Sequence, residues 1–461
     1  MRMSDSSLID VMRKAETGPI CLEKDFDRNI LRIKLQEVIK EFDITYNPDF
    51  LIPNDNNLAD ALFNAAFDLY LEIGTLCVST HRQIKFEETE IKEALRNAAK
   101  RVIFGEGSDT REMAPRKVED QTPPLCLTSG GCEISEDIYV QVVQSYAQNP
   151  LADTISGGCP LHTIFGIIPK AGTPAEVLAS MYNVIYSKEG AKRAGRPLIG
   201  FHNLLGTALS AAGYISASQP ELGVRPVDGN LIASLAELKT DYSQLTKALF
   251  YSERKNVLSG AVYVPLMGGY GGGPEGTAIV TLAHHLQGVL VHQVSYADFP
   301  VTHLRYSCST ARESLWVASI VGQALSRNTH LLTASEAITA AGPCTEMCLY
   351  EVAASSIVGT ASGIHINNAS AAKSQYLDRE TGMEAKMGCE VGHAATGMKR
   401  TNANELVKQL LQMYDQKLEK PPLGRKFQEC YDVTTVKPSK EYVDVYTRVK
   451  NELEELGLNL E

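Results

Sequence analysis

AVYVPLM, residues 261–267, followed at once by GGYGGGPEG, residues 268–276, is the stretch that decides the fold. The first part is a short run of apolar, β-branched and aromatic residues, which favours a strand. The second part concentrates glycine and proline where a chain turns tightly and starts a helix. The segment therefore predicts a strand that leads directly into a helix.

The same order of strand and helix recurs between about residues 125 and 400. We predict further strands over 198–201, 289–294 and 303–306. Capping boxes, which mark helix starts, occur at 173–176, 310–313 and 381–384. Alternation over roughly 275 residues predicts an α/β fold of the (β/α)₈ TIM-barrel type, whose usual length is about 250. A doubly wound open sheet fits the same alternation, but the many repeats favour the barrel.

The flanking regions predict additional helices. We divide the chain into an N-terminal helical region (1–124), a catalytic barrel (125–400) and a C-terminal helical extension (401–461). The clearest N-terminal helix spans residues 86–104, and residues 106–124 should form a loop or edge element. Two amphipathic helices are expected over 403–419 and 440–457.

Composition excludes several classes of protein. The 461 residues carry a net charge of -11, which argues against nucleic acid or an anionic membrane as partner. Residues 1–14 contain no apolar run, and no stretch reaches the length of a membrane span. The ten cysteines are scattered singly. We therefore expect a cytoplasmic protein with reduced thiols.

Three motifs allow a functional interpretation beside a structural one. Gly271–Gly276 matches GxGxxG and could bind NAD(P), although Pro274 and Glu275 stand where bare backbone is needed. Adjacent His284 and His285 point in different directions on a helix, so we expect them in the core or at the surface. Cys344 and Cys348 have helical spacing but no local third ligand. We predict no bound metal.

Several motifs in fixed order resemble the monomethylamine:corrinoid methyltransferase family. The most specific are AGPCTEMCL (341–349), TGMEA (381–385) and FQECYDV (427–433), and AGRP (194–197) precedes them. The resemblance extends from about residue 20 to the end of the chain. It implies a homo-oligomeric barrel, most simply a hexamer, that acts in methanogenesis by passing a methyl group from methylamine to Co(I) of a separate corrinoid protein. The barrel itself should bind no cofactor, and no DxHxxG corrinoid motif occurs.

The chain departs from this family at the reactive position. The family's pyrrolysine falls on His202 or Asn203, and its nearby catalytic glutamate falls on Val262. A second acidic position falls on Leu231, and a glutamine falls on Glu336. Neither His nor Asn is an electrophilic imine, so the route through a pyrrolysine adduct is not expected.

A methyl group on a positive centre needs no such adduct, because a neutral amine leaves. We therefore expect a quaternary or other cationic N-methyl substrate. His202, Asn203 and Glu336 are the candidate catalytic residues, with His202 as a possible general acid. The candidate cation-binding aromatic residues are Phe201, Tyr214, Tyr270, Tyr296, Phe299 and Tyr306. Two alternatives stay open: an NAD(P)-dependent oxidoreductase, and a non-catalytic barrel that only docks a corrinoid protein.

Overall fold

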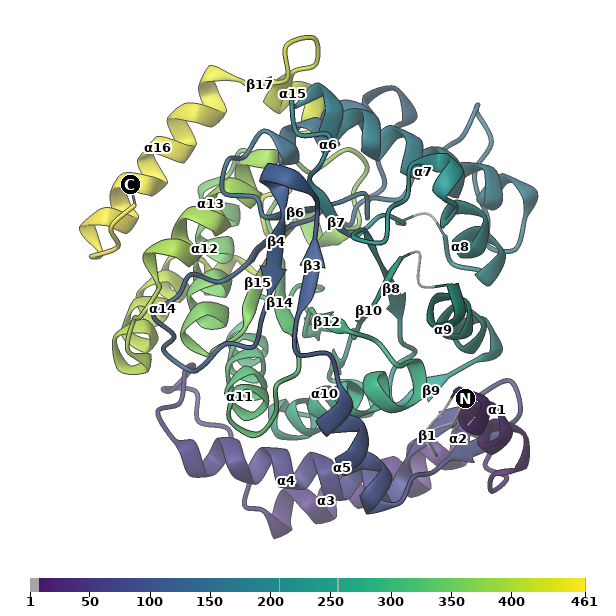
Figure 1. Ribbon diagram of the computed structural model, residues 1–461. Helices are drawn as coiled ribbons and strands as arrows, with labels where there is room; N and C mark the ends of the chain where they lie inside the picture. Colours follow the sequence, from purple (N-terminus) through teal and green to yellow (C-terminus); the bar gives the residue numbers. More distant parts are fainter. Residues whose placement is uncertain (1–7, 207, 255–256, 461) are drawn as a thin grey trace.

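The computed structural model describes residues 8–206, 208–254 and 257–460, and its centre is an eight-stranded parallel barrel (Figure 1). The strands follow one another around the barrel in chain order. The ring closes between the third and fourth strands, where the Leu204 amide donates to the Gly229 carbonyl at 3.0 Å. The predicted TIM barrel is confirmed. Its strands are β5 (Cys126–Thr128), β6 (Thr154–Ser156), β7 (Gly200–Asn203), β8 (Gly229–Ala233), β10 (Leu258–Val262), β12 (Tyr296–Phe299), β14 (Thr333–Ile338) and β15 (His365–Ser370).

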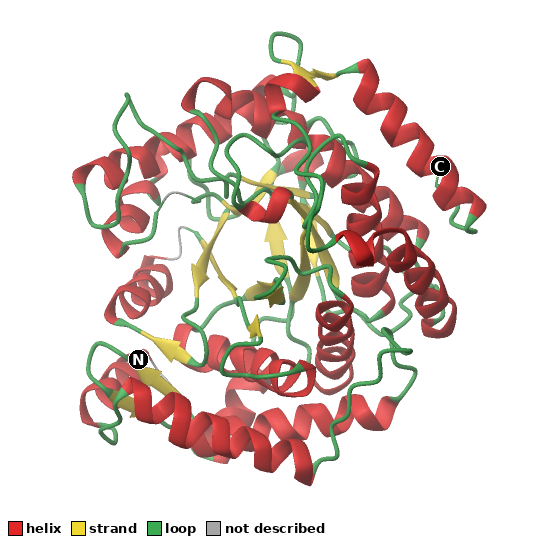
Figure 2. Ribbon diagram, turned by 180° about the vertical axis from the view of Figure 1, so that it is seen from behind, coloured by secondary structure: helices red, strands yellow, loops and turns green. Residues whose placement is uncertain are grey.

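A helix follows each barrel strand, and these helices form the outer layer (Figure 2). Two of the predicted capping residues start their helices: the Thr173 hydroxyl accepts from the Glu176 amide, and the Thr381 hydroxyl accepts from the Met383 amide. The helices are α6 (Tyr139–Ala147), α7 (Pro174–Arg193), α8 (Ala211–Ala217), α9 (Tyr242–Arg254), α10 (Pro274–Gln287), α11 (Arg312–Asn328), α12 (Glu346–Ala361) and α13 (Gly382–Ala394).

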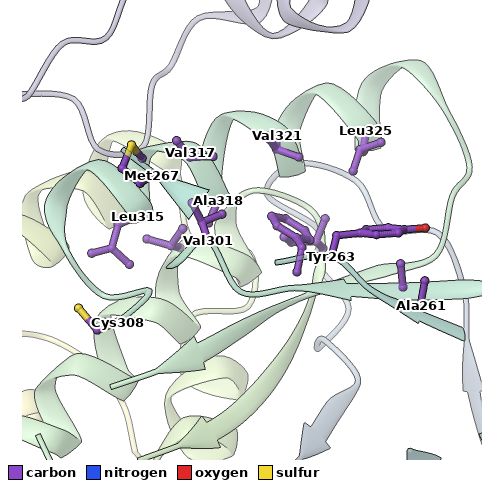
Figure 3. Close-up of a cluster of buried hydrophobic side chains, with 14 of the residues drawn as sticks. Ala261, Tyr263, Met267, Val301, Cys308, Leu315, Val317, Ala318, Val321 and Leu325 are labelled. Atoms are coloured by element: carbon purple, nitrogen blue, oxygen red, sulfur yellow. The ribbon is translucent and has the colours of Figure 1, made fainter. Parts of the chain in front are cut away.

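The main core lies between the barrel strands and this helical layer. Figure 3 shows part of it, where apolar side chains of α11 pack near the end of β10. Leu315, Ala318, Val321 and Leu325 recur every three or four residues along α11 and are all buried. Burial of each larger aliphatic side chain contributes roughly 1.5–3 kcal/mol, so this layer holds the barrel strands in place.

A β-hairpin closes the N-terminal end of the barrel (Figure 1). It consists of β3 (Val102–Phe104) and β4 (Arg111–Met113), which are antiparallel. Its side chains pack with Tyr296 and Leu332 at the starts of barrel strands. The helix predicted over 86–104 is therefore wrong in its second half. Helix α5 (Glu88–Asn97) ends early, because the apolar residues after it fill the barrel floor.

The N-terminal helices pack against the outside of α10 and α11, and the C-terminal helices pack beside α12 and α13 (Figure 1). A small sheet of β1 (Thr75–Cys77), β2 (Arg82–Ile84) and β9 (Lys239–Thr240) joins the N-terminal region to the segment after β8. The remaining helices are α1 (Leu8–Thr17), α2 (Glu23–Asp25), the π-helical η1 (Phe26–Leu31), α3 (Arg32–Glu41), α4 (Asn56–Ile73), α14 (Arg400–Tyr414), α15 (Phe427–Cys430) and α16 (Lys440–Glu455). Residues 1–7 of the polar N-terminal stretch lie outside the described part.

Three further predicted elements differ from the structure. Residues 289–294 are not a strand: Gly288–His292 forms the π-helical η5, which extends α10, and a short buried apolar run does not distinguish the two states. Of residues 303–306, only His303 is in a strand, β13 (Thr302–His303), which pairs with β11 (Leu266–Met267) beside the barrel. The 310–313 capping box is wrong as well, because Ala311 caps α11 and the Thr310 hydroxyl donates to the Glu351 carboxylate. In the described residues, no helix has the length and apolar character needed to cross a bilayer.

Candidate active site

The candidate site lies inside the barrel, above the apolar floor and toward the C-terminal ends of the strands. Alternation along a strand fixes which side chains point inward. A Cβ added to Gly200 would meet Phe104 of the hairpin, so the side chain two residues later, His202, also faces the interior. Tyr296 likewise lies against Gly229 and Gly260, so Asp298 faces inward one level higher. This is the end at which TIM barrels carry their active sites.

Two carboxylic acids, Asp298 on β12 and Glu336 on β14, share this interior. The Asn367 side-chain amide donates to Asp298 Oδ2 at 2.7 Å, and the Ser370 hydroxyl donates to Glu336 Oε1 at 2.8 Å. Burial raises the pKa of Asp298 well above its usual range, and the charge of Glu336 raises it further. Burial also raises the pKa of Glu336. Among the described residues, no lysine or arginine forms an ion pair with either acid.

His202 lies in the same interior as a neutral ring. Its Nδ1 is 2.9 Å from the Thr154 hydroxyl on β6, and 1% of the residue is exposed. Burial lowers the pKa of His202 to about 3. The ring is therefore uncharged at neutral pH, and it does not match the protonated general acid expected from the sequence.

Asn203, the other candidate for the pyrrolysine position, joins two strands. Its Oδ1 accepts from the backbone amides of Leu205 and Leu231, both at 3.4 Å. The side chain thus stabilises the junction of β7 and β8, where a register shift follows Ile155 on the neighbouring strand. Val262, at the family's glutamate position, lies beside Asp298 in the strand register.

Several buried polar atoms of this interior have no hydrogen-bond partner in the part of the chain that the structure describes. They are His202 Nε2, Asp298 Oδ1, Asn367 Oδ1 and Ser129 Oγ. Buried polar atoms are normally satisfied, so their concentration in one interior is typical of a site that binds a polar ligand. Their pattern also suits a cation, because three of the four carry accepting lone pairs.

The six predicted aromatic residues do not come together as a cage. Phe201 points outward, with the Lys188 ammonium 4.7 Å from its ring, and Phe299 packs against His285 of α10. Tyr214 lies on α8 and donates to the Leu231 carbonyl from behind the barrel wall. Tyr306 stacks beside His303, with ring centroids 4.6 Å apart.

Two of these aromatics remain near the interior. Tyr296 belongs to the floor, where its ring meets Phe104 edge-on at 5.2 Å and its hydroxyl donates to the His202 carbonyl. Tyr270 is 47% exposed and lines a hollow beside the barrel mouth with Glu237. Burial raises the pKa of Glu237 to about 7. We find an acidic interior rather than the expected aromatic one.

The glycine-rich segment forms a tight turn rather than an open phosphate-binding loop. A Cβ on Gly276 would lie 2.1 Å from the Gly271 carbonyl oxygen, which shows how closely the turn is packed. Glu275, in the first turn of α10, accepts from the Tyr46 amide at 3.0 Å. The strand before the turn, β11, belongs to a two-stranded sheet outside the barrel. The dinucleotide alternative therefore lacks its structural context.

The histidine and cysteine pairs have structural surroundings. His284 and His285 are buried and hydrogen-bonded, and burial lowers their pKa values to about 3 and 4. Cys344 precedes α12 in a left-handed conformation, whereas Cys348 lies in its first turn. These two thiols therefore do not present the helical pair that the spacing predicted.

Sequence reasoning missed Asp298, Asn367, Thr154 and Ser370. A signal for Asp298 was present, because the acid stands between two aromatic residues in an otherwise apolar strand, YADF. The polar strand HINNAS, residues 365–370, gave a similar signal, because consecutive amides are unusual in a buried strand.

Comparison with known proteins gives consistent matches over the whole chain. The profile of the monomethylamine methyltransferase MtmB family matches residues 6–458. Monomethylamine methyltransferase MtmB3 of Methanosarcina barkeri (strain Fusaro) is 36% identical over 452 residues, covering 97% of each chain. Monomethylamine methyltransferase MtmB of Methanosarcina mazei is 35% identical over the same length and coverage. Crystal structures of the M. barkeri enzyme and of a hydroxylamine MtmB complex each superpose with a TM-score of 0.94 at 34% identity, covering 98% of both chains.

Proposed function

Because this chain belongs to the monomethylamine methyltransferase MtmB family and is a methyltransferase, we propose that it transfers a methyl group from a methylated amine to a corrinoid. The acceptor would be Co(I) of a corrinoid held by a separate protein that docks over the C-terminal end of the barrel. The unpartnered buried polar atoms at that end support this placement, since they are groups to which a small polar substrate would hydrogen-bond.

We propose further that the substrate is a cationic N-methyl compound. The observation that carries this proposal is the pair Asp298 and Glu336, two buried acids that have no cationic partner in the described chain. A buried acid pair is costly when both members ionise, and a bound cation would remove that cost. The substrate would thus supply the missing positive charge.

The methyl transfer itself then requires little covalent help from the protein. The corrinoid supplies Co(I) as the nucleophile. The carbon–nitrogen bond breaks as the methyl carbon is attacked, and its electron pair stays on nitrogen, so a neutral amine leaves. Asp298 and Glu336 would hold the cation and orient its methyl group, and the closed barrel floor would exclude water.

His202 would contribute as a neutral hydrogen-bonding group instead of the imidazolium acid expected from the sequence. Thr154 bonds Nδ1 and leaves Nε2 unpaired in the described structure. With the Nδ1 lone pair accepting from Thr154, Nε2–H is a donor for a polar group of the substrate, such as a carboxylate. Asn203 would stabilise the junction of β7 and β8 and so hold His202 in position.

A panel of methyl donors tests the proposal. We would incubate the purified protein anaerobically with chemically reduced cobalamin as the acceptor probe and follow the corrinoid absorption spectrum. Tetramethylammonium and carboxylated quaternary amines should support transfer, and monomethylamine should not. Robust transfer from monomethylamine, with none from quaternary amines, would reject the substrate class.

Two further arms separate the alternatives. NAD(P)H should leave the thermal unfolding midpoint unchanged, whereas an oxidoreductase would be stabilised by it. Binding of a quaternary amine should strengthen as pH rises through the titration of the acid pair, because the raised pKa values keep the acids protonated at lower pH. A folded protein that neither binds nor demethylates any donor would instead be the non-catalytic barrel. Light scattering would test the homo-oligomer implied by the resemblance.

A further inference from the structure

A second cluster of chemically reactive side chains lies at the opposite end of the barrel from the candidate active site. Cys126 begins β5, Asp153 precedes β6, and His393 lies in the last turn of α13. One ligand atom from each lies within 4.8 Å of the other two. We propose that these residues bind a structural zinc ion.

The donor set fits zinc better than a hard cation. Thiolate, imidazole and carboxylate are the three side-chain ligand types of zinc, at distances of about 2.0–2.3 Å. Tetrahedral geometry then places ligand atoms about 3.3–3.8 Å apart, so atoms that lie within 4.8 Å of one another need to approach by no more than about 1.5 Å. Both Asp153 oxygens already have partners, Arg111 Nε and the Cys126 amide, each at 2.8 Å, but each oxygen keeps a further lone pair.

Cys389 would supply the fourth ligand, from outside the group of three residues whose ligand atoms lie within 4.8 Å of one another. It precedes His393 by one helical turn on α13, so the two side chains share a face. Its side chain packs in one buried cluster with that of Cys126. The Asn149 amide donates to Cys389 Sγ at 3.3 Å, the type of outer hydrogen bond that orients a zinc-bound thiolate.

An independent observation is the buried Arg116 beside the cluster. Its residue is 6% exposed, and all three guanidinium nitrogens lack a hydrogen-bond partner in the described chain. The guanidinium interacts electrostatically with Asp120, Cys126 and His393. Zinc with two thiolates, one carboxylate and one neutral imidazole carries one net negative charge. That charge would add to the attraction that Asp120 already exerts on the buried Arg116 guanidinium.

The location explains what such an ion would do. Cys126 on β5 pairs directly with Ile366 on β15, so the cluster sits at the seam where the first and last barrel strands meet. Its other ligands come from the last barrel helix and from the start of the second strand. Zinc would therefore hold the first and last barrel strands together and would take no part in the reaction.

The test uses metal binding by the full chain. Protein stripped with a chelator under reducing, anaerobic conditions should bind one zinc or cobalt ion per chain. Cobalt should give thiolate-to-metal charge-transfer absorption and the intense visible bands of tetrahedral coordination. Zinc at a hundred times its Kd should raise the unfolding midpoint by about 3 °C.

Substitutions of the ligand residues, compared with substitutions of the same residue types elsewhere, test where the ion binds. His393→Gln, which changes a partly exposed residue, and Cys126→Ser should each lose the cobalt spectrum and the thermal shift. Cys77→Ser and His162→Gln, which lie elsewhere, should keep both. Wild-type protein that binds less than one ion without charge-transfer absorption would overturn the proposal. So would a Cys126–Cys389 disulfide in anaerobically purified protein, or a cobalt spectrum unchanged in His393→Gln.

Discussion

Asp298 illustrates how a residue that lowers the stability of the fold can serve ligand binding. Its side chain is buried inside the barrel, one level above Tyr296, with Glu336 as a neighbouring acid. Only one of its oxygens, Oδ2, has a partner in the described chain, the Asn367 amide. An acid that stabilised only the fold would be better replaced by an apolar side chain, so its position indicates a ligand.

We predict that Asp298→Asn gains stability and loses activity. The raised pKa means that the folded protein loses stability as pH rises from the acid's unfolded pKa of about 4 toward its folded value. The amide removes this penalty and keeps an acceptor for Asn367. At pH 8, the free energy of unfolding should increase by about 1–3 kcal/mol, while transfer from a quaternary amine falls about 100-fold.

Circular dichroism melts and the corrinoid assay measure the two effects. The gain in stability should shrink below about pH 4, where both protein states hold the proton. Glu336→Gln is the matched control for the second acid, because it is isosteric and should weaken the same reaction. A less stable Asp298→Asn, or one with full activity, would contradict the assigned role of the acid pair.

Some residues of the candidate site could be predicted from the sequence, and others could not. Glu336 and His202 were placed in the barrel by resemblance, and the structure puts both in one interior. The structure does not contain the predicted aromatic cage. The direction of a strand side chain depends on register, and Phe201 and Phe299 each lie one residue away from a position that faces inward. Asp298 sits at that inward position and was overlooked for the same reason.

At the scale of elements, the β3–β4 hairpin explains why the barrel has a floor. Phe104 is fully buried, and it fills the space left by Gly200 on β7. The sheet pairing of Val102 with Met113 holds it there. Its first strand was predicted as the end of a helix and its second as part of a loop or edge element, because the long-range contacts that decide their state are not visible in the local sequence pattern.

We predict that Phe104→Ala destabilises the fold by about 3–5 kcal/mol, the usual cost of removing a buried phenylalanine. Urea unfolding measures the loss, and Phe50→Ala, at a 54% exposed position, is the control that should change little. Because the hairpin and the acid pair lie at opposite ends of the barrel, methyl transfer at low temperature should persist. A change below about 0.5 kcal/mol would show that the hairpin does not close the barrel.

The elements that were predicted correctly share strong local signals. Helix α7 begins at a threonine–proline cap, and α16 begins at a serine cap before an amphipathic sequence. The errors fall on short apolar runs such as 289–294, where a buried helix and a buried strand have the same composition. Periodicity needs length, and these runs are shorter than two helical turns or one long strand.

At the scale of the whole molecule, buried histidines and buried glutamates have opposite effects on how the free energy of unfolding changes with pH. Burial lowers the pKa values of five histidines to about 3–4: His202, His284, His285, His292 and His365. Burial raises those of four glutamates to about 7: Glu237, Glu351, Glu380 and Glu384. The histidines stabilise the fold above their unfolded pKa of about 6.5, and the glutamates stabilise it below theirs of about 4.3.

We therefore predict a stability plateau with a sharp acid edge. Burial also raises the pKa of Asp298, so five acids oppose the five histidines. Between about pH 5 and 6.5, each group changes the free energy of unfolding by about 1.4 kcal/mol per pH unit, with opposite signs for acids and histidines, so the unfolding midpoint should stay nearly constant. Below about pH 4.5 the glutamates are protonated in both states and only the histidines contribute, so the midpoint should fall steeply. Glu384→Gln removes one opposing group and should make the midpoint rise with pH across the plateau. Thermal melts from pH 4 to 8 measure both curves, and a wild-type midpoint that climbs steadily from pH 5 to 7 would show that the glutamates are ionised in the folded protein.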